Sequence, residues 1–241
     1  MNRFFYMIAA YNEEALLFPL CRKLEEITQR FPGSQILLLD NGSTDRTWQM
    51  MQDLSLRHPG RIHALHSDEK GMGVAFRMGL EKLKNESLTN QDWVVFAAAD
   101  LPFAFTDLEG LLAVSQSERS ETVAFVGSKS HPRSIAPRDW RRRLGSAVFS
   151  ILRRAFLGLK TQDTQGSIFL RGDLAAQFAD FKANDFFYAI EIIDRAEQMG
   201  RVTEIPIQVS PEKRPSKVRL VRDGMKMFLQ LVRYRRYRPK M

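Results

Sequence analysis

Residues 4–14 read FFYMIAAYNEE and residues 36–45 read ILLLDNGSTD. In both stretches a short apolar run passes directly into polar or glycine-containing residues. KGMG at 70–73 and DLP at 100–102 likewise follow apolar runs. Apolar runs of this length, separated by helical patterns, are typical of buried parallel strands. Because ligands bind outside the carboxyl ends of such strands, we expect the four polar segments to converge on one crevice.

Strand-like and helix-like patterns alternate outward from these runs, which predicts an α/β fold with a mostly parallel, doubly wound sheet. Ser43 or Thr44 is expected to cap the second helix, and Asn12 or Glu13 to open the first. We expect strands at 4–10, 36–39, 62–65, 93–98, 122–126, 167–170 and 202–209. We expect helices from 12 or 13 to about 32, from 43 or 44 to about 56, and at 72–84, 106–117, 138–159, 174–181 and 187–199, with one more near the C-terminus.

The composition, with 44% apolar and 27% charged residues among 241, is that of a soluble globular protein. No apolar stretch approaches the roughly 18 residues that a membrane-spanning helix needs. Cys21 is the single cysteine, which excludes an intrachain disulfide or a zinc site built from cysteines. The chain enters a strand pattern at once, without a signal-peptide pattern, so we expect a cytoplasmic location.

The positive charge is concentrated at the C-terminal end. Residues 212–241 hold 11 Lys/Arg and 2 Asp/Glu, a local net charge of +9, so residues 1–211 carry about −1 of the total +8. We therefore divide the chain into a body, 1–211, and a basic amphipathic segment, 212–241. A basic segment on a nearly neutral body favours an anionic surface as partner. Nucleic acid is the less favoured choice, because no known nucleic-acid-binding motif is present.

Two segments combine an apolar stripe with basic residues, as helices at a membrane surface do. Packing against the protein core explains the same stripes equally well. In the first segment, arginines 141–143, 153 and 154 lie on or beside the face opposite the apolar one. The first stripe comprises Trp140, Leu144, Ala147, Val148, Ile151, Leu152, Ala155, Phe156 and Leu159, and the second comprises Val218, Val221, Met225, Phe228, Leu229 and Val232.

Eight short motifs resemble, in order, those of the inverting glycosyltransferases of family two. Within that family the chain most resembles the polyprenyl-phosphate (dolichyl-phosphate) mannose and glucose synthases, and the resemblance extends from Tyr6 to about Lys217. It implies a Rossmann-like GT-A fold and a nucleotide-sugar donor such as a UDP or GDP sugar. The motifs are AYNEE at 10–14, DNGSTD at 40–45, KGMGVA at 70–75, GSK at 127–129, RRLGS at 142–146, DTQ at 163–165, EIPI at 204–207 and SK at 216–217.

The first two motifs supply residue types suited to binding a nucleoside. The carboxylate of Asp40 can accept a hydrogen bond from an N–H group of uracil or guanine. Tyr11 can stack on the base, with packing of its own loop as the alternative, and the backbone around Ala9 can reach the base edge. Glu13 either hydrogen-bonds the ribose or caps the following helix.

The glycine-rich motif is suited to binding phosphate. Gly71 and Gly73 permit a tight turn that brings backbone close to the nucleotide, and Lys70 can contact a phosphate. The position of this motif between a strand and a helix strengthens the interpretation.

The metal-binding motif departs from the family pattern. Where family members carry Asp-x-Asp, this chain has Ala98, Ala99 and Asp100. Mg²⁺ is often held by one or two carboxylates together with substrate phosphates. Asp100 alone is therefore expected to bind Mg²⁺ or Mn²⁺ weakly, if the reaction requires metal at all. Pro102 and Ala189 also stand where related synthases carry polar residues.

A polyprenyl phosphate is the expected acceptor. A phosphate monoester is already anionic and needs cationic positioning, whereas a sugar hydroxyl needs a general base. The reaction would be an in-line displacement at the anomeric carbon, with the nucleotide diphosphate leaving. Lys129, Arg142 and Ser146 occupy family positions suited to the acceptor, and Arg133, Lys213 and Arg214 add positive charge.

Two alternatives remain open for the function. A family-two enzyme that glycosylates a glycan hydroxyl would need a base, and Asp163, Glu191 and Asp185 are the candidates. The changes at the metal motif and at Ala189 also fit a non-catalytic nucleotide-sugar-binding homologue. In the favoured interpretation the protein lies at the cytoplasmic face of a membrane, and a membrane-embedded subunit or a second copy of the chain are further expected partners.

Overall fold

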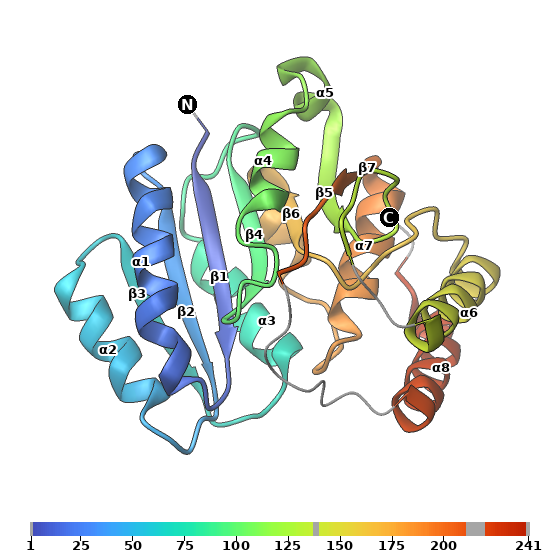
Figure 1. Cartoon of the computed structure of the whole chain (residues 1–241), viewed down its shortest axis with the longest axis horizontal. Helices are drawn as coiled ribbons and strands as arrows, with labels where there is room; N and C mark the ends of the chain where they lie inside the picture. Colours follow the sequence, from blue (N-terminus) through green and yellow to red (C-terminus); the bar gives the residue numbers. More distant parts are fainter. Residues whose placement is uncertain (1, 137–139, 211–219, 240–241) are drawn as a thin grey trace.

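The computed structural model describes residues 2–136, 140–210 and 220–239, and for 140–144 and 220–225 it describes the backbone alone. Its centre is a seven-stranded sheet in the order β3-β2-β1-β4-β6-β5-β7 (Figure 1). β6 is antiparallel to its neighbours β4 and β5, and the other pairings are parallel. The strands are β1 (Phe4–Ala10), β2 (Gln35–Asn41), β3 (Ile62–Ser67), β4 (Trp93–Ala98), β5 (Thr122–Ser128), β6 (Ile168–Arg171) and β7 (Arg201–Pro206).

The central strand β1 is buried along its whole length, and its alternate side chains enter two different cores. Phe4, Tyr6 and Ile8 pack in one core with α1 (Glu14–Arg30), α2 (Thr47–Arg57) and α4 (Thr106–Leu112). Phe5 and Met7 pack in the other core with α3 (Met72–Leu83) and α7 (Tyr188–Met199), which cover the opposite face (Figure 1). A strand with both faces buried reads as a continuous apolar run, which is why these strands could be predicted.

Three predicted local features differ from the structure. The helix expected at 106–117 is two helices, α4 and α5 (Gln116–Glu121), because the Ser115 hydroxyl accepts the Glu118 N–H and starts a new helix. The segment expected at 174–181 is a 3₁₀ helix, η1 (Gly172–Phe178). Neither Ser43 nor Thr44 caps α2, because Asp45 accepts the hydrogen bond from the Thr47 N–H at 2.9 Å.

The first amphipathic segment forms α6 (Trp140–Leu157), and only part of its predicted apolar face is buried, since Leu152 and Phe156 pack against the core. Val148 and Ile151 are 50% and 67% exposed, whereas Arg153 is buried. The Arg153 guanidinium donates to the Gln162 carbonyl at 2.8 Å and stacks over the Phe149 ring. A buried arginine that donates to a carbonyl and stacks on a ring can occupy a position that periodicity assigns to solvent, here with Nε and Nη1 left without a hydrogen-bond partner among the described residues.

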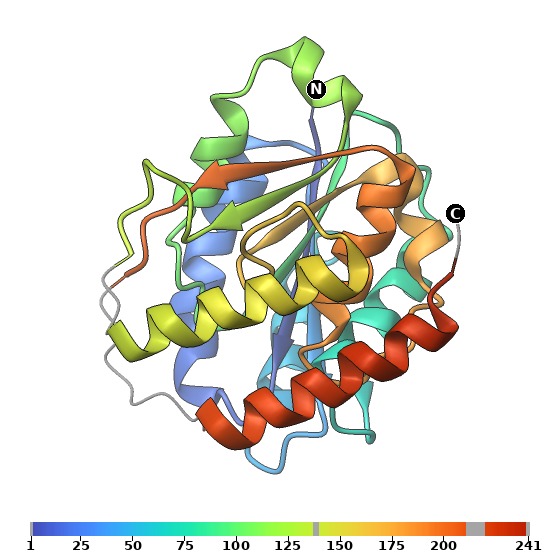
Figure 2. The same cartoon turned by 90° about the vertical axis from the view of Figure 1, so that its right-hand side faces the viewer.

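The second segment forms α8 (Leu220–Tyr237), which lies beside α6 in Figure 2. Among the side chains that the structure describes on this helix, Leu231 and Tyr234 are buried, and Phe228 meets Phe156 of α6 at 5.7 Å between ring centroids. Leu229, expected in the apolar stripe, is 61% exposed. Val218 lies outside the described residues, and the structure describes no side chain for Val221 or Met225.

Hydrogen bonds attach the end of α8 to α7. Tyr234 donates to Asp194 at 2.9 Å, and Arg238 donates to both oxygens of the same carboxylate at 2.8 and 2.6 Å. Tyr237 donates to Glu191 at 3.0 Å. Part of the basic segment therefore packs on the body. Among the described residues, no helix has the length and apolar character that crossing a bilayer requires.

Candidate functional site

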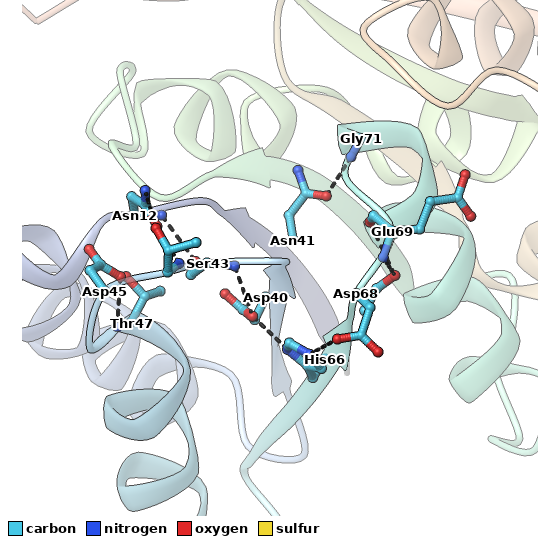
Figure 3. Close-up of polar contacts among 12 residues, drawn as sticks. Asn12, Asp40, Asn41, Ser43, Asp45, Thr47, His66, Asp68, Glu69 and Gly71 are labelled. Atoms are coloured by element: carbon cyan, nitrogen blue, oxygen red, sulfur yellow. Dashed lines mark hydrogen bonds and ion pairs between the residues drawn. The ribbon is translucent and has the colours of Figure 1, made fainter.

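The carboxyl ends of β1 to β4 lie in register at one edge of the sheet, as predicted from the four polar segments. Ala10 is aligned with Asp40, Asp40 with His66, and Ala9 with Ala98. Ala9 is buried, and its carbonyl accepts the Ala99 N–H at 3.3 Å. The loops that follow these strands can therefore contact one another (Figure 3).

The loops after β1 and β2 are held together by Asn12. Its backbone N–H donates to the Ser43 hydroxyl at 3.0 Å, and its side-chain oxygen accepts the Thr44 N–H at 2.8 Å (Figure 3). Asn12 has a φ of 54°, a conformation that asparagine adopts more readily than most residues. Next to it, the Glu13 N–H donates to Thr47 Oγ1 at 2.8 Å. Glu13 occupies the N-cap position of α1, but its side chain makes no capping hydrogen bond there.

Asp40 is fully buried at the end of β2. Both donors that the structure assigns to it approach the same oxygen, Oδ2: His66 Nδ1 at 2.7 Å and the Ser43 N–H at 3.4 Å (Figure 3). The other oxygen, Oδ1, is buried and has no hydrogen-bond partner among the described residues. A buried polar atom without a partner is costly and often marks a functional site.

His66 is a site residue that the sequence analysis missed. Its Nε2 lies 3.0 Å from Asp68 Oδ1, so the ring bridges two carboxylates, and its centroid is 5.1 Å from the Trp48 ring. Hydrogen bonds that the ring makes to Asp68 and then to Asp40 raise the His66 pKa above its ordinary value, although partial burial opposes this. The signal was present in the sequence, since His66 ends an apolar run just as Asp40 does.

Tyr11 and Lys70 come together from different loops. Lys70 Nζ donates to the Tyr11 hydroxyl at 2.9 Å and lies 4.8 Å from the ring centroid. Both side chains are exposed, so each is accessible to a ligand. The pairing places a cation and an aromatic ring at the same edge of the sheet as Asp40.

Gly71 and Gly73 have a packing role that the sequence did not reveal. A Cβ on Gly71 would lie 2.1 Å from the Asn184 carbonyl oxygen, and one on Gly73 would lie 2.0 Å from that of Ala183. The Gly73 N–H also donates to the Asn184 carbonyl at 2.9 Å. The glycines therefore allow the start of α3 to contact the loop that precedes α7. Beside them, Asn41 accepts the Gly71 N–H through its side chain.

Asp100 is exposed immediately beyond β4, at the same edge of the sheet. The described residues contain no group of three or more His, Cys, Asp or Glu side chains arranged to hold a metal ion. Asp100 fits a Mg²⁺ or Mn²⁺ ion only as one ligand, with diphosphate oxygens and waters completing the coordination shell. Leu101, Ala104 and Phe105, in the loop that follows, have φ values of 39°, 44° and 64°. Such backbone conformations are strained for residues other than glycine and cluster at functional sites.

The expected acceptor residues are only partly described. Lys129 follows β5; its N–H donates to Asp163 at 2.9 Å, and its ammonium lies 5.8 Å from the Phe103 ring centroid. Ser146 is exposed on α6, and Arg133 is exposed in the loop after β5. The side chain of Arg142, together with residues 213 and 214, lies outside the described part of the chain.

The three carboxylates considered as general bases all accept hydrogen bonds from the protein. Asp163 accepts the Lys129 and Gln165 N–H groups, both at 2.9 Å. Glu191 is buried and accepts the Lys182 N–H at 2.7 Å as well as the Tyr237 hydroxyl.

Asp185 is engaged by three donors: the Phe187 N–H, Gln230 and Lys226. Burial would raise the Asp185 pKa, but hydrogen bonds from Lys226 and Gln230 outweigh it and hold that pKa below its ordinary value. A carboxylate with a lowered pKa is a weaker base.

Comparison with known proteins now identifies the family. The model of glycosyltransferase family 2 matches residues 6–176, which is most of the chain. The chain belongs to glycosyltransferase family 2. This confirms the resemblance inferred from the motifs, and the matched region contains the strand-end loops from Tyr11 to Asp163.

Two curated family 2 relatives are similar along most of the chain. Glycosyltransferase AglD of Haloferax volcanii is 29% identical over 234 residues, which is 94% of this chain but 36% of AglD. Polyprenol monophosphomannose synthase of Mycolicibacterium smegmatis is 28% identical over 216 residues, or 86% of this chain and 77% of that enzyme.

A solved structure confirms the GT-A fold. Glucosyl-3-phosphoglycerate synthase of Mycobacterium tuberculosis, in complex with Mn²⁺, UDP-glucose and phosphoglyceric acid, has a TM-score of 0.64 and 18% sequence identity. The alignment covers 98% of this chain and 80% of the synthase. At this identity the comparison establishes the architecture of this family 2 glycosyltransferase.

Proposed function

We propose that this glycosyltransferase moves a hexose from a nucleotide sugar to a polyprenyl phosphate. The observation that carries the proposal is the hydrogen bonding of the carboxylates of Asp163, Glu191 and Asp185. Each accepts two or more hydrogen bonds that hold the protein's own segments together, so we assign none of them as the base that a hydroxyl acceptor would need. A phosphate acceptor needs no such base. The similarity to a polyprenol monophosphomannose synthase supports the same acceptor class.

The donor would lie across the ends of β1 to β4. In this arrangement Asp40 Oδ1 accepts a hydrogen bond from an N–H of the base, and the exposed Tyr11 ring stacks on the base. Lys70, beside Tyr11, offsets the negative charge that develops on the departing diphosphate. The acceptor phosphate attacks the anomeric carbon from the opposite side, so the configuration inverts.

Asp100 would hold a divalent ion together with the diphosphate. Such an ion, when bound, would neutralise charge on the leaving group. On the acceptor side, Lys129, Ser146 and Arg142 would position the lipid phosphate, because cationic groups and a hydroxyl bind its oxygens well.

The protein would work at the cytoplasmic face of a membrane, where a polyprenyl phosphate presents its head group. Exposed apolar side chains on α6 and α8, together with the excess of basic residues in 212–241, support this location. We retain residues 1–211 as the catalytic domain and 212–241 as the membrane-contacting segment. A membrane-embedded subunit or a second copy of the chain would provide an additional route to the lipid.

Transfer of labelled hexose from UDP- and GDP-sugars into lipid extracts containing polyprenyl phosphate tests the proposal. Arg142→Ala should raise the KM for the lipid by about tenfold or more, because a phosphate contact is lost, while nucleotide affinity stays unchanged. Arg154→Ala, an exposed arginine on the same helix, is the matched control. Labelling of a glycan hydroxyl, with none in the lipid fraction, would disprove the proposed acceptor.

A further inference from the structure

His66 imposes an asymmetry on the carboxylate of Asp40. A carboxylate ordinarily offers two equivalent oxygens, each able to accept hydrogen bonds. In this site His66 Nδ1 and the Ser43 N–H both approach Oδ2. Oδ1, which is equally buried, is left without a partner among the described residues. Of the two oxygens, only Oδ1 therefore keeps an unused acceptor site, and because it is buried a base can reach it only if the groups that cover it move.

The far side of the ring holds His66 in this position. Nε2 lies 3.0 Å from Asp68 Oδ1, and the Trp48 ring packs near the imidazole. Carboxylate oxygens only accept hydrogen bonds, so both contacts are satisfied together when both ring nitrogens carry protons. A doubly protonated ring between two carboxylates is an electrostatically favourable arrangement, and it resists rotation away from Oδ2.

We propose that His66 determines base specificity by occupying Asp40 Oδ2, so that the site accepts a uracil-type base and discriminates against guanine. This inference rests on the proposed role of Asp40 in binding the nucleotide base. His66 acts here as a positioning residue, because it reaches the base only through the Asp40 carboxylate.

The chemistry of the two bases explains the discrimination. The Watson–Crick edge of uracil has a single N–H between two carbonyl groups, and Oδ1 alone can accept that N–H. Guanine presents two neighbouring donors, N1–H and the N2 amino group, which pair best with both oxygens of a carboxylate. With Oδ2 occupied, one guanine donor would be buried without an acceptor. A site that leaves a polar group of the ligand unpaired in this way binds that ligand much more weakly.

The positive charge of the ring adds a second effect. A carbonyl of uracil next to the N–H would approach Oδ2 and be repelled by an unshielded carboxylate oxygen. The His66 N–H at 2.7 Å from Oδ2 withdraws that negative charge. Removing the imidazole should therefore weaken uracil binding and, at the same time, open Oδ2 to guanine.

Calorimetric titration of the full-length protein with UDP and with GDP tests this inference. Wild type should bind UDP at least about tenfold more tightly than GDP. His66→Leu should bring the two affinities to within about threefold of each other. His66→Asn, which keeps an N–H donor near the position of Nδ1, should retain the wild-type preference. His58→Leu removes a histidine at the far end of α2, where it contacts Glu25, and should change neither affinity.

The inference is overturned if wild type binds GDP as well as UDP, if it binds neither, or if His66→Leu weakens both equally. Should His66→Leu fail to fold, the wild-type ratio and its retention in His66→Asn decide the question. Asp40→Ala separates the two proposals, because unchanged affinity in that variant removes Asp40 from the base site altogether. The titrations involve no acceptor, so they are independent of the lipid-transfer assay.

Discussion

At the scale of single residues, the site depends on how neighbours modify a few polar side chains. Asp40 alone would be a symmetric acceptor, and His66 makes it asymmetric. Lys70 and Tyr11 are individually ordinary surface residues, but their contact places charge and aromatic surface side by side. The chemical character of the site therefore comes from pairs of residues.

The pairing of His66 with two carboxylates predicts a pH-dependent stability. Its pKa is raised in the folded state, chiefly by Asp68 and then Asp40. The added stability is fully present below the unfolded pKa of about 6.5 and is lost as the pH rises through the higher folded pKa. Urea unfolding of wild type should therefore show a larger decrease in stability above about pH 6.5 than unfolding of His66→Asn. Parallel pH profiles for the two proteins would contradict this.

Asp100 gives a second prediction at this scale. With a single carboxylate, the protein should require Mg²⁺ or Mn²⁺ at millimolar concentration, or retain activity in EDTA. Ala98→Asp, which restores the usual pair, should increase metal affinity measured by titration in the presence of the nucleotide diphosphate. Tight, stoichiometric metal binding by wild type without nucleotide would be the opposite result.

At the scale of elements, close contacts between segments distant in sequence determine the geometry of the site. The start of α3 contacts the loop before α7 through Gly71 and Gly73. Glu191, from α7, accepts the N–H groups of Lys182 and Ala183 in that same loop. α7 thus holds the loop against which the glycine-rich segment packs, and α8 is in turn hydrogen-bonded to α7.

Gly73→Ala should destabilise the fold by about 2 kcal/mol or more, because the new methyl group would overlap the Ala183 carbonyl. Urea unfolding monitored by circular dichroism measures this. Gly60→Ala is the matched control, since Gly60 has a φ of +75° and no heavy atom within 4 Å of the added Cβ. The control should lose only about 1 kcal/mol from its backbone conformation. Equal losses for the two variants would mean that the α3 contact adapts easily.

At the scale of the whole molecule, the sheet brings the donor residues to one edge, and α6 and α8 pack together on one side (Figure 2). Val148 and Ile151 on α6 and Leu229 on α8 remain exposed there, while Leu231 and Tyr234 pack inward. Since α8 contributes to the core, its deletion would damage the body as well as any membrane contact. Surface substitutions are therefore the better test.

Val148→Ser, Ile151→Ser and Leu229→Ser, combined, should abolish most binding to anionic liposomes in flotation assays while leaving the melting temperature nearly unchanged. Leu56→Ser is the control, because Leu56 is 80% exposed on α2. Wild-type binding should decrease at high salt, as expected for interactions of basic residues with anionic lipids. If wild type does not bind anionic liposomes, we would assign these exposed apolar side chains to a contact with another protein.

The sequence alone was enough to predict the strand order along the chain, the loops that form the site, and the family. These features are local: an apolar run, a polar loop and a helical period each occupy adjacent residues. Asp40, Tyr11 and Asp100 could be named as candidates because each directly follows such a run, and Lys70 because it opens the glycine-rich motif. The structure places all four at the carboxyl edge of the sheet.

Tertiary structure decided what those residues contact. The alignment of β2 with β3 pairs His66 with Asp40, and the packing of α3 against the loop before α7 explains Gly71 and Gly73. It also decided that Arg153 is buried on α6 while Ile151 is exposed. Each of these depends on groups far apart in the chain, whose free energy of contact outweighs the preference that periodicity records.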